Sequence, residues 1–375
     1  MNRKRSFRLV ICFLSLAILV SCSANSPAEP EKTLQEKLQS ALDDSLSRHA
    51  GKGASAAVSI PGKEIWRGTS GISHEGVPVR TEMKFAIASI TKSFTATLVL
   101  KLVEEGRLSL DDRIDNWIPP LPNIAGTITV RQLLNHTSGL YNLALHPDLK
   151  AAVLADLTRS WKPEELLTQF VLEPYCAPGA GWNYSNTNYI ILGMITEQIT
   201  GSTLTQQLRS RFFTPLKLQN TFVDAEEETP GVIAHPWYDL NEDGVYVDIS
   251  DYPRTASSST GWAAGAIYST PEDLVRWSNA LLHDRTVLGQ STLDQMLDFL
   301  PLPGGLGSGL GIFIADRFLD GVQGIGHDGG TAGFSARMVY MPASGVSIAV
   351  CVNKNDYDCH NDIARALATV VLEDQ

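Results

Sequence analysis

Leucine recurs every four residues at positions 34, 38, 42 and 46, and two short strand-like stretches follow at 54–60 and 64–68. A spacing of four is typical of the buried stripe of an amphipathic helix. Two short stretches around a Pro-Gly turn, here Pro61-Gly62, are typical of paired strands. The pattern therefore predicts a helix followed by two strands.

The C-terminal part has the same elements in reverse order. Residues 334–341 and 346–352 alternate as two strands around a turn, and residues 362–372 have a helical pattern. The region between the two ends is mostly helical, with long loops. Strands from both ends most simply share one sheet. We therefore predict an α/β (α+β) fold for residues 34–375: a three-layer α-β-α lobe whose antiparallel sheet is built from both chain ends, plus an inserted, mostly helical lobe.

The first 22 residues have a different character. Four cations precede a 12-residue apolar run at 9–20, and Leu-Val-Ser-Cys follows at 19–22. The run is shorter than the roughly 20 residues that cross a bilayer, but it suits a secretory signal peptide. The ending resembles the lipobox of bacterial lipoproteins, in which the cysteine becomes lipidated.

This resemblance implies a signal peptide over residues 1–22 that ends at a lipidated Cys22, followed by a polar tether at 23–33. We expect an exported bacterial lipoprotein that is anchored to a membrane and faces the periplasm or the cell exterior. Ser23 suits the outer membrane if the cell has two membranes. An uncleaved signal anchor is the alternative.

The charge balance excludes one class of partner. The chain has 30 Lys+Arg against 41 Asp+Glu, a formal net charge of −11. Nucleic-acid binding needs clustered cations, so no nucleic-acid partner is expected. The eight histidines show no zinc-ligand spacing, and neither a metal nor another cofactor is predicted.

Three cysteines lie outside the leader: Cys176, Cys351 and Cys359. Export permits a disulfide. Cys351 ends a strand-like run and Cys359 precedes a helical stretch, so these two form the plausible bridge. The other pairings stay open, because spacing alone does not choose among three cysteines.

The first candidate for chemistry is Ser89-Ile-Thr-Lys92, at the start of an apolar helical run over 91–105. A serine hydroxyl is a poor nucleophile alone. A desolvated lysine one turn further on can accept its proton, and the helix dipole favours negative charge at this end. The alternative is an N-cap serine beside a solvated lysine.

The second candidate is Tyr184-Ser-Asn186, just before an apolar helix at 189–199. A phenol can shuttle protons if cations lower its pKa, and the Asn186 amide can hold a substrate carbonyl. The alternative is a helix N-cap behind a packed tyrosine.

The third candidate is His327-Asp328-Gly329-Gly330, directly before the C-terminal strand pair. Glycines on a strand edge let a ligand approach the backbone closely and leave an N–H for an oxyanion.

In this order the three motifs resemble those of the penicillin-recognising serine hydrolases, the group of class C β-lactamases, serine DD-carboxypeptidases, D-aminopeptidases and related esterases. The likeness extends from about residue 33 to the C-terminus, and it includes flanking runs such as TVRQLLNHTSGL at 129–140. It implies a β-lactamase/transpeptidase-like fold and two-step acyl transfer through an acyl-enzyme.

The resemblance also implies catalytic roles. Ser89 stands at the position of the acylated nucleophile, Lys92 at that of its basic partner, and Tyr184 at that of the proton shuttle.

The implied substrate-binding residues are Asn186, His327, Asp328, Gly329 and Gly330. Asn186 would contact the substrate carbonyl, and His327 would be an electrostatic partner of Tyr184. The backbone N–H groups of Ser89 and Gly330 would form the oxyanion hole.

Asp328 departs from the family pattern, which often has Thr or Ser at this position. A carboxylate that faces the site would repel a substrate carboxylate and would favour an amine-bearing or uncharged ester substrate. Because strand side chains alternate between faces, Asp328 can equally turn away into an ion pair. Both orientations stay open.

The resemblance does not separate the activities of the group. We expect a DD-carboxypeptidase-like or D-aminopeptidase-like peptidase acting on D-amino-acid peptides. The alternatives are a β-lactamase or carboxylesterase, and a catalytically idle protein that binds cell-wall peptides. The expected partners are therefore a small peptide, β-lactam or ester substrate, and the membrane through the lipid anchor.

Overall fold

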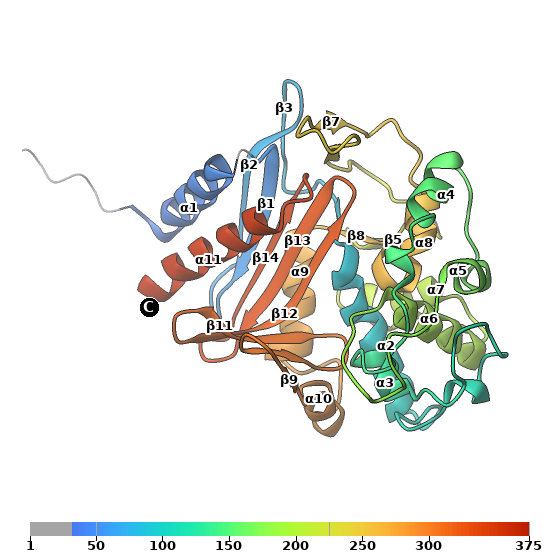
Figure 1. Ribbon diagram of the computed structural model, residues 1–375. Coiled ribbons are helices and arrows are strands. Elements are labelled where there is room, and N and C mark those ends of the chain that lie inside the picture. The colour runs from blue at the N-terminus through green and yellow to red at the C-terminus, as the bar shows by residue number, and fades with distance from the viewer. Residues whose placement is uncertain (1–31, 50, 225, 375) are drawn as a thin grey trace, which may run out of the picture.

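The computed structural model describes residues 32–49, 51–224 and 226–374 (Figure 1). The predicted signal peptide, the proposed lipidation site Cys22 and nearly all of the tether lie outside these residues. Within the described ranges, no helix combines the length and the apolar character that a membrane span requires.

A nine-stranded antiparallel sheet forms the centre of the larger lobe, in the order β3-β2-β1-β14-β13-β12-β11-β10-β9. The strands are β1 (Gly53–Ser59), β2 (Trp66–His74), β3 (Val77–Pro78), β9 (Leu300–Leu302), β10 (Leu306–Ser308), β11 (Phe313–Leu319), β12 (Val322–Thr331), β13 (Phe334–Met341) and β14 (Val346–Val352). The chain ends meet where β1 pairs with β14, from Ala54 opposite Val352 to Ser59 opposite Ser347. The predicted sheet built from both ends is confirmed, although β2 is longer than the expected strand at 64–68.

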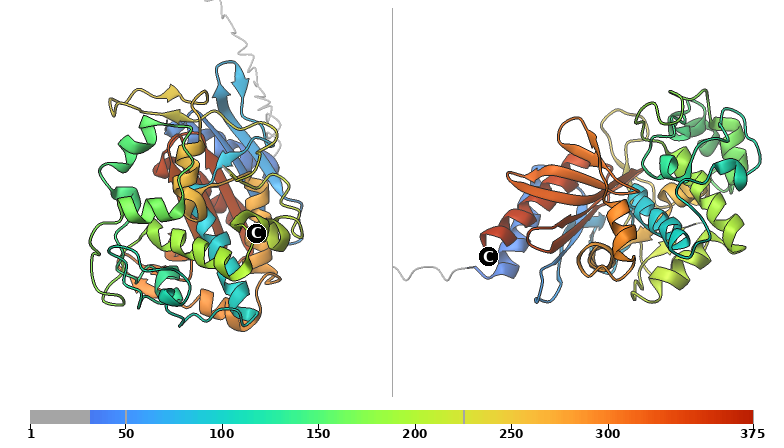
Figure 2. Two further views of the ribbon diagram at one scale, coloured as in Figure 1. Left: turned by 90° about the vertical axis from the view of Figure 1, so that its right-hand side faces the viewer. Right: turned by 90° about the horizontal axis from the view of Figure 1, so that it is seen from below.

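Two terminal helices, α1 (Leu34–Arg48) and α11 (Tyr357–Glu373), lie side by side on one face of this sheet (Figures 1 and 2). Thr33 caps α1: its hydroxyl accepts the Glu36 N–H, and the Glu36 carboxylate accepts the Thr33 N–H. The leucines at 38, 42 and 46 are buried between the helices and the sheet, as their spacing predicts.

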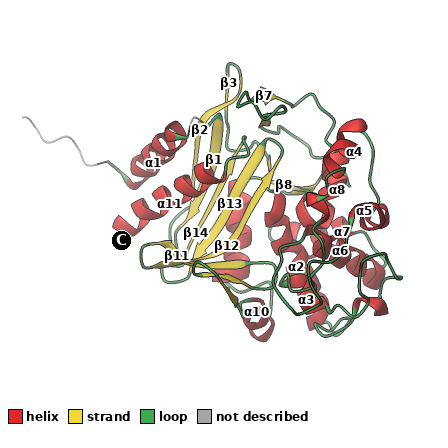
Figure 3. Cartoon of the chain, in the orientation of Figure 1, coloured by secondary structure: helices red, strands yellow, loops and turns green. Residues whose placement is uncertain are grey.

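The other face of the sheet carries α9 (Pro271–Ser278) and meets the helical lobe (Figure 3). The central helices of that lobe are α2 (Thr91–Glu104), α6 (Asn186–Thr200) and α8 (Thr255–Gly265). Shorter helices surround them: α3 (Val130–Leu134), α4 (Leu149–Ala155), α5 (Pro163–Phe170), α7 (Leu204–Leu208) and α10 (Gln290–Met296). Helix α2 is buried on nearly every side, which explains why its sequence is apolar around the whole helix.

Two small sheets connect the lobes. One has the order β4-β8-β5, from β4 (Phe85–Ala86), β8 (Ile267–Ser269) and β5 (Phe222–Val223). The other pairs β6 (Trp237–Tyr238) with β7 (Val247–Asp248) in an antiparallel hairpin. Strand β4 leads directly into the segment that carries Ser89.

The expected bridge between Cys351 and Cys359 is wrong, because Cys176, Cys351 and Cys359 are all free thiols. Cys351 lies on β14 and faces the core shared with the helical lobe, whereas Cys359 lies on α11 in the core on the opposite face. The sheet therefore separates the two sulfur atoms. Burial raises the pKa of both thiols, that of Cys359 to about 12.

We expect Cys351 and Cys359 to resist N-ethylmaleimide in the folded protein, because both thiols are buried and protonated. After unfolding in denaturant without reductant, both should be alkylated, as peptide mapping by mass spectrometry will show. If either one is alkylated only after a reductant is added, the thiol assignment is wrong.

Candidate active site

Ser89 lies at the junction of the two lobes, in a 3₁₀ turn (Ala88–Ile90) that leads into α2. Ala88, the residue before it, has φ of +44°, a left-handed conformation that costs a non-glycine residue free energy. The turn packs against β12, where a Cβ added to Gly329 would come within 2.0 Å of the Ile87 carbonyl oxygen and 3.1 Å of the Ser89 nitrogen. Only glycine permits this approach of the strand to Ser89.

Lys92 is fully buried one turn into α2. Its Nζ lies 2.9 Å from Ser89 Oγ and donates to the Ala264 carbonyl oxygen at 2.7 Å. Burial lowers the pKa of Lys92 well below its usual range, because the charged form is poorly solvated there. A neutral amine next to a serine hydroxyl is a general base.

A kink in α8 supplies the carbonyl that Lys92 contacts. Trp262 has φ of +32° and interrupts the helix. The following carbonyl groups point to α2: Ala263 accepts from Thr95 Oγ1, and Ala264 accepts from Lys92. Both carbonyls lie in the last turn of α8, where backbone carbonyl groups have no partner within the helix.

Tyr184 precedes α6, and its hydroxyl donates to Ser89 Oγ at 2.9 Å. The starts of α2 and α6 in the helical lobe thus bring Ser89, Lys92 and Tyr184 together, as the resemblance implies. The sequence-based expectation for the phenol was wrong in one respect, because burial raises the pKa of Tyr184, whereas we expected cations to lower it. The phenol is therefore a protonated donor in this state.

His136 packs against the Tyr184 ring, with ring centroids 4.4 Å apart. Its Nδ1 accepts from the Ser185 N–H and faces the Asn188 amide nitrogen at 3.1 Å. Burial lowers the pKa of His136 well below its usual range, so the ring is neutral. His136 therefore holds the Tyr184 ring in place and braces the segment before α6.

His327 points from β12 to the same side of the sheet as Gly329. Its ring centroid lies 6.4 Å from that of Tyr184, and its Nδ1 lies 2.6 Å from the Asp328 carbonyl oxygen. Burial lowers the pKa of His327 to about 4. The ring is neutral near pH 7, and its buried Nε2 has no hydrogen-bond partner within the described protein.

Asp328 turns away from Ser89, which decides between the two orientations left open by the sequence. Its carboxylate pairs with Arg337 on β13, with Nη1 at 2.6 and 2.7 Å from the two oxygens. His360 of α11 lies on the same side, with Nε2 at 3.8 Å from Asp328. Gly330 also faces α11, where a Cβ would meet the Tyr357 hydroxyl. Alternation along β12 therefore excludes Asp328 from direct charge repulsion at Ser89.

The profile of the Beta-lactamase family matches residues 34–371, nearly all of the described chain. The chain belongs to the Beta-lactamase family. This family member is a serine hydrolase with the β-lactamase/transpeptidase-like fold, as its sequence motifs implied.

Two curated relatives illustrate the range of the family. Penicillin-binding protein 4 of Amycolatopsis lactamdurans is 30% identical over 339 residues, covering 84% of each chain. Esterase EstB of Burkholderia gladioli is 33% identical over 218 residues, covering 54% of this chain and 55% of the esterase.

Two solved structures share the fold at similar identity. A D-stereospecific amidohydrolase from Streptomyces sp. is 32% identical, with a TM-score of 0.78 over 89% of this chain and 98% of the other. The D-amino acid amidase from Ochrobactrum anthropi SV3 is 30% identical, with a TM-score of 0.79 over 91% and 99%.

Asn186 of this Beta-lactamase family member lies at the N-terminus of α6 and borders the same cavity as Ser89. Its backbone N–H and side-chain amide both donate to the Asn142 side-chain oxygen, at 3.0 and 3.2 Å. Asn142 thus fixes the Asn186 amide. The sequence did not point to Asn142, because its role depends on a contact between loops that are 44 residues apart.

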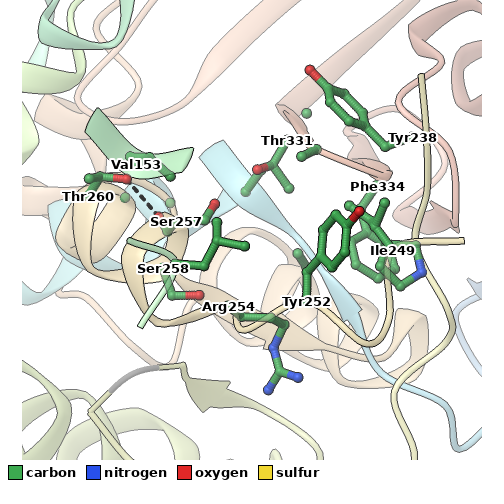
Figure 4. A pocket seen from close by; sticks show the side chains of 18 of the residues that line it. Val153, Tyr238, Ile249, Tyr252, Arg254, Ser257, Ser258, Thr260, Thr331 and Phe334 are labelled. Carbon is green, nitrogen blue, oxygen red and sulfur yellow. Dashed lines mark hydrogen bonds between the residues drawn. The ribbon is translucent and has the colours of Figure 1, made fainter. Parts of the chain in front are cut away.

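A cavity of about 620 Å³ opens beside Ser89 (Figure 4). Asn186, Gly330 and Thr331 line it near the serine, and α4, the segment after β7 and the start of α8 form its outer walls. Four aromatic side chains line it: Tyr238, Tyr252, Tyr268 and Phe334.

Replacing Asp328 with Thr should leave the ratio of activity on acidic and neutral substrates unchanged within about twofold, because the carboxylate faces α11. The free energy of unfolding should fall by about 2 kcal/mol, since Arg337 loses its partner in a largely buried place. Asp316→Thr, at an exposed position of β11, is the matched control for urea denaturation. A selective gain on carboxylate-bearing substrates would contradict this orientation.

Acid should destabilise the protein partly through His327. The pKa of this ring is about 4 when folded, against about 6.5 when exposed, so between these values the unfolded chain binds a proton that the folded chain does not. The stabilisation is present above about pH 6.5 and is lost as pH falls towards 4. From pH 7 to 5 we expect a loss on the order of 2 kcal/mol from this residue.

Urea denaturation of the wild type and of His327→Gln at both pH values measures this contribution. The variant should lose correspondingly less stability between pH 7 and 5. Equal losses in the two proteins would show that His327 does not titrate in this way.

Proposed function

We propose that this protein hydrolyses amide bonds of short D-amino-acid peptides or amides through an acyl-enzyme on Ser89. The observation that carries the proposal is the pair of 2.9 Å contacts that join Ser89 Oγ to Lys92 Nζ and to the Tyr184 hydroxyl. A base and a proton donor thus flank one nucleophile.

In the first step, Ser89 Oγ attacks the carbonyl carbon of the substrate, and its proton passes to the neutral Lys92 amine. The carbonyl oxygen gains negative charge, which the backbone N–H groups of Ser89 and Gly330 are proposed to stabilise. The fixed amide of Asn186 is proposed to hold a second carbonyl of the substrate.

In the second step, the carbon–nitrogen bond breaks and the leaving nitrogen takes a proton from Tyr184. The raised pKa of Tyr184 keeps the phenol protonated before the reaction and makes its phenolate readily take a proton back afterwards. The proton that Lys92 took from Ser89 then returns to the phenolate, which closes the proton balance. Water hydrolyses the acyl-enzyme by the reverse order of transfers and restores the Ser89 hydroxyl.

The two D-specific amide hydrolases that share the fold over nearly their whole length support an amide substrate of D configuration.

Ester hydrolysis is the second candidate, supported by the similarity to Esterase EstB over about half of each chain. The same Ser89 chemistry serves an ester, whose alcohol leaves more readily than an amine. We further propose that Cys22 is the lipidation site of an exported lipoprotein, on the sequence pattern at 19–22.

Ser89→Ala should lower kcat for D-amino-acid amides and for p-nitrophenyl esters by about 10⁴-fold or more, because no other nucleophile is proposed. Ser291→Ala, at an exposed serine of α10, is the matched control and should retain full activity. Ammonia release and p-nitrophenol release measure the two reactions.

Ser89→Ala that keeps more than a trace of either activity would refute the nucleophile. A wild-type protein that hydrolyses neither substrate, while a proven amidase does so in parallel, would instead support the idle, peptide-binding alternative.

A further inference from the structure

We infer that the cavity beside Ser89 receives the acyl part of the substrate and selects a bulky, uncharged, apolar side chain. This inference rests on the proposed function. It names a substrate class, amides of aromatic or long aliphatic D-amino acids, in place of the D-alanyl compounds typical of cell-wall peptides.

The position of the proton donor shows on which side of the scissile bond the cavity lies. The leaving nitrogen must reach Tyr184 to take its proton, so the leaving group lies on the Tyr184 side of Ser89. Neither Tyr184 nor His327 lines the cavity, whereas Ser89 and Asn186 do. The cavity is therefore on the other side of the reacting carbonyl, where the acyl part remains attached to Ser89.

The size of the cavity argues against a small acyl group. Its volume of about 620 Å³ lies within the range of about 300–1,000 Å³ that is usual for sites that enclose small molecules. The methyl group of alanine would leave most of this space to water. An aromatic ring or a branched chain would fill more of it and would bury more apolar area.

The walls of the cavity are apolar on opposite sides. Val153 of α4 lies on one side, and Ile249, Tyr252 and Phe334 gather on the other (Figure 4). Leu154 and Tyr252 also line the cavity, and they are 52% and 47% exposed. Large apolar side chains left in water at the walls of a cavity gain free energy when an apolar group covers them.

The charges on the cavity walls argue against a charged side chain on the acyl part of the substrate. None of the described residues that line the cavity is Asp or Glu, so an ammonium group at the end of the acyl side chain meets no carboxylate there. The cations Lys150 and Arg254 are paired, and His235 Nδ1 lies 2.7 Å from the Asp248 carboxylate. A charged group that entered would lose hydration without gaining a partner.

The test uses the full-length protein and four substrates with the same leaving group: the amides of D-alanine, D-leucine, D-phenylalanine and D-lysine. Ammonia release should give a kcat/KM for the leucine and phenylalanine amides at least tenfold above that for the alanine amide. The lysine amide should have a lower kcat/KM than the leucine and phenylalanine amides, although its side chain is of comparable size. A D-alaninamide turned over as well as D-phenylalaninamide would overturn the inference.

Val153→Asp places a carboxylate in the α4 wall. It should lower the ratio of kcat/KM for the phenylalanine amide to that for the alanine amide about tenfold, and it should raise the rate for the lysine amide about tenfold. Ala151→Asp is the matched control, because it adds the same charge to α4 at an exposed residue that does not line the cavity. If the two variants change the ratios equally, the cavity does not hold the acyl side chain.

Failure of the proposed amidase function can be distinguished from failure of this inference. If no amide is hydrolysed while p-nitrophenyl esters are, the amidase proposal fails, and p-nitrophenyl acetate and hexanoate then test the cavity. A hexanoate preference of tenfold or more supports the inference, and an acetate preference overturns it. Hydrolysis of no amide and no ester overturns both proposals.

Discussion

The complete burial of the Lys92 amine beside the Ser89 hydroxyl is the constraint on which the site depends. A buried ammonium group without a carboxylate partner loses several kcal/mol of solvation, and burial accordingly lowers the pKa of Lys92. The fold imposes this burial, because α2 packs against α6, α7 and α8 in the core. The proposed base is therefore a product of core packing, and its second partner, the Ala264 carbonyl, is neutral and stabilises the ammonium form less than a carboxylate would.

The two lobes contribute different parts of the site. The helical lobe supplies Tyr184 and Asn186, held by His136 and Asn142. The sheet supplies β12, which approaches Ser89 through Gly329 and turns Asp328 towards Arg337. Selectivity is proposed to come from a third region, the cavity walls on α4 and after β7. Chemistry and substrate choice thus lie on separate segments, which fits a family whose members include an esterase, amide hydrolases and a penicillin-binding protein.

The sequence predicted the elements that repeat a strong pattern and the motifs that meet at the site. The leucine spacing of α1 and the alternation of β13 and β14 placed the sheet and its outer layer. The orientation of Asp328 was not predictable. Neighbouring side chains on a strand lie on opposite faces of the sheet, but this alternation does not show which of them faces Ser89. The same ambiguity produced the wrong bridge, since Cys351 and Cys359 lie on opposite faces of the sheet. The raised pKa of Tyr184 and the role of Asn142 depend on burial and on contacts between distant loops.

The pH dependence of Ser89 labelling by a fluorophosphonate tests the central claim most directly. The Ser89 oxygen displaces fluoride from phosphorus, a step that needs the base but no bound peptide, and peptide mapping identifies the labelled residue. With Lys92 as a buried neutral base, labelling of the folded protein should be fast at pH 7 and should decline only well below pH 10.5, the ordinary lysine value. Labelling that appears only as the pH approaches 10.5 would contradict the account.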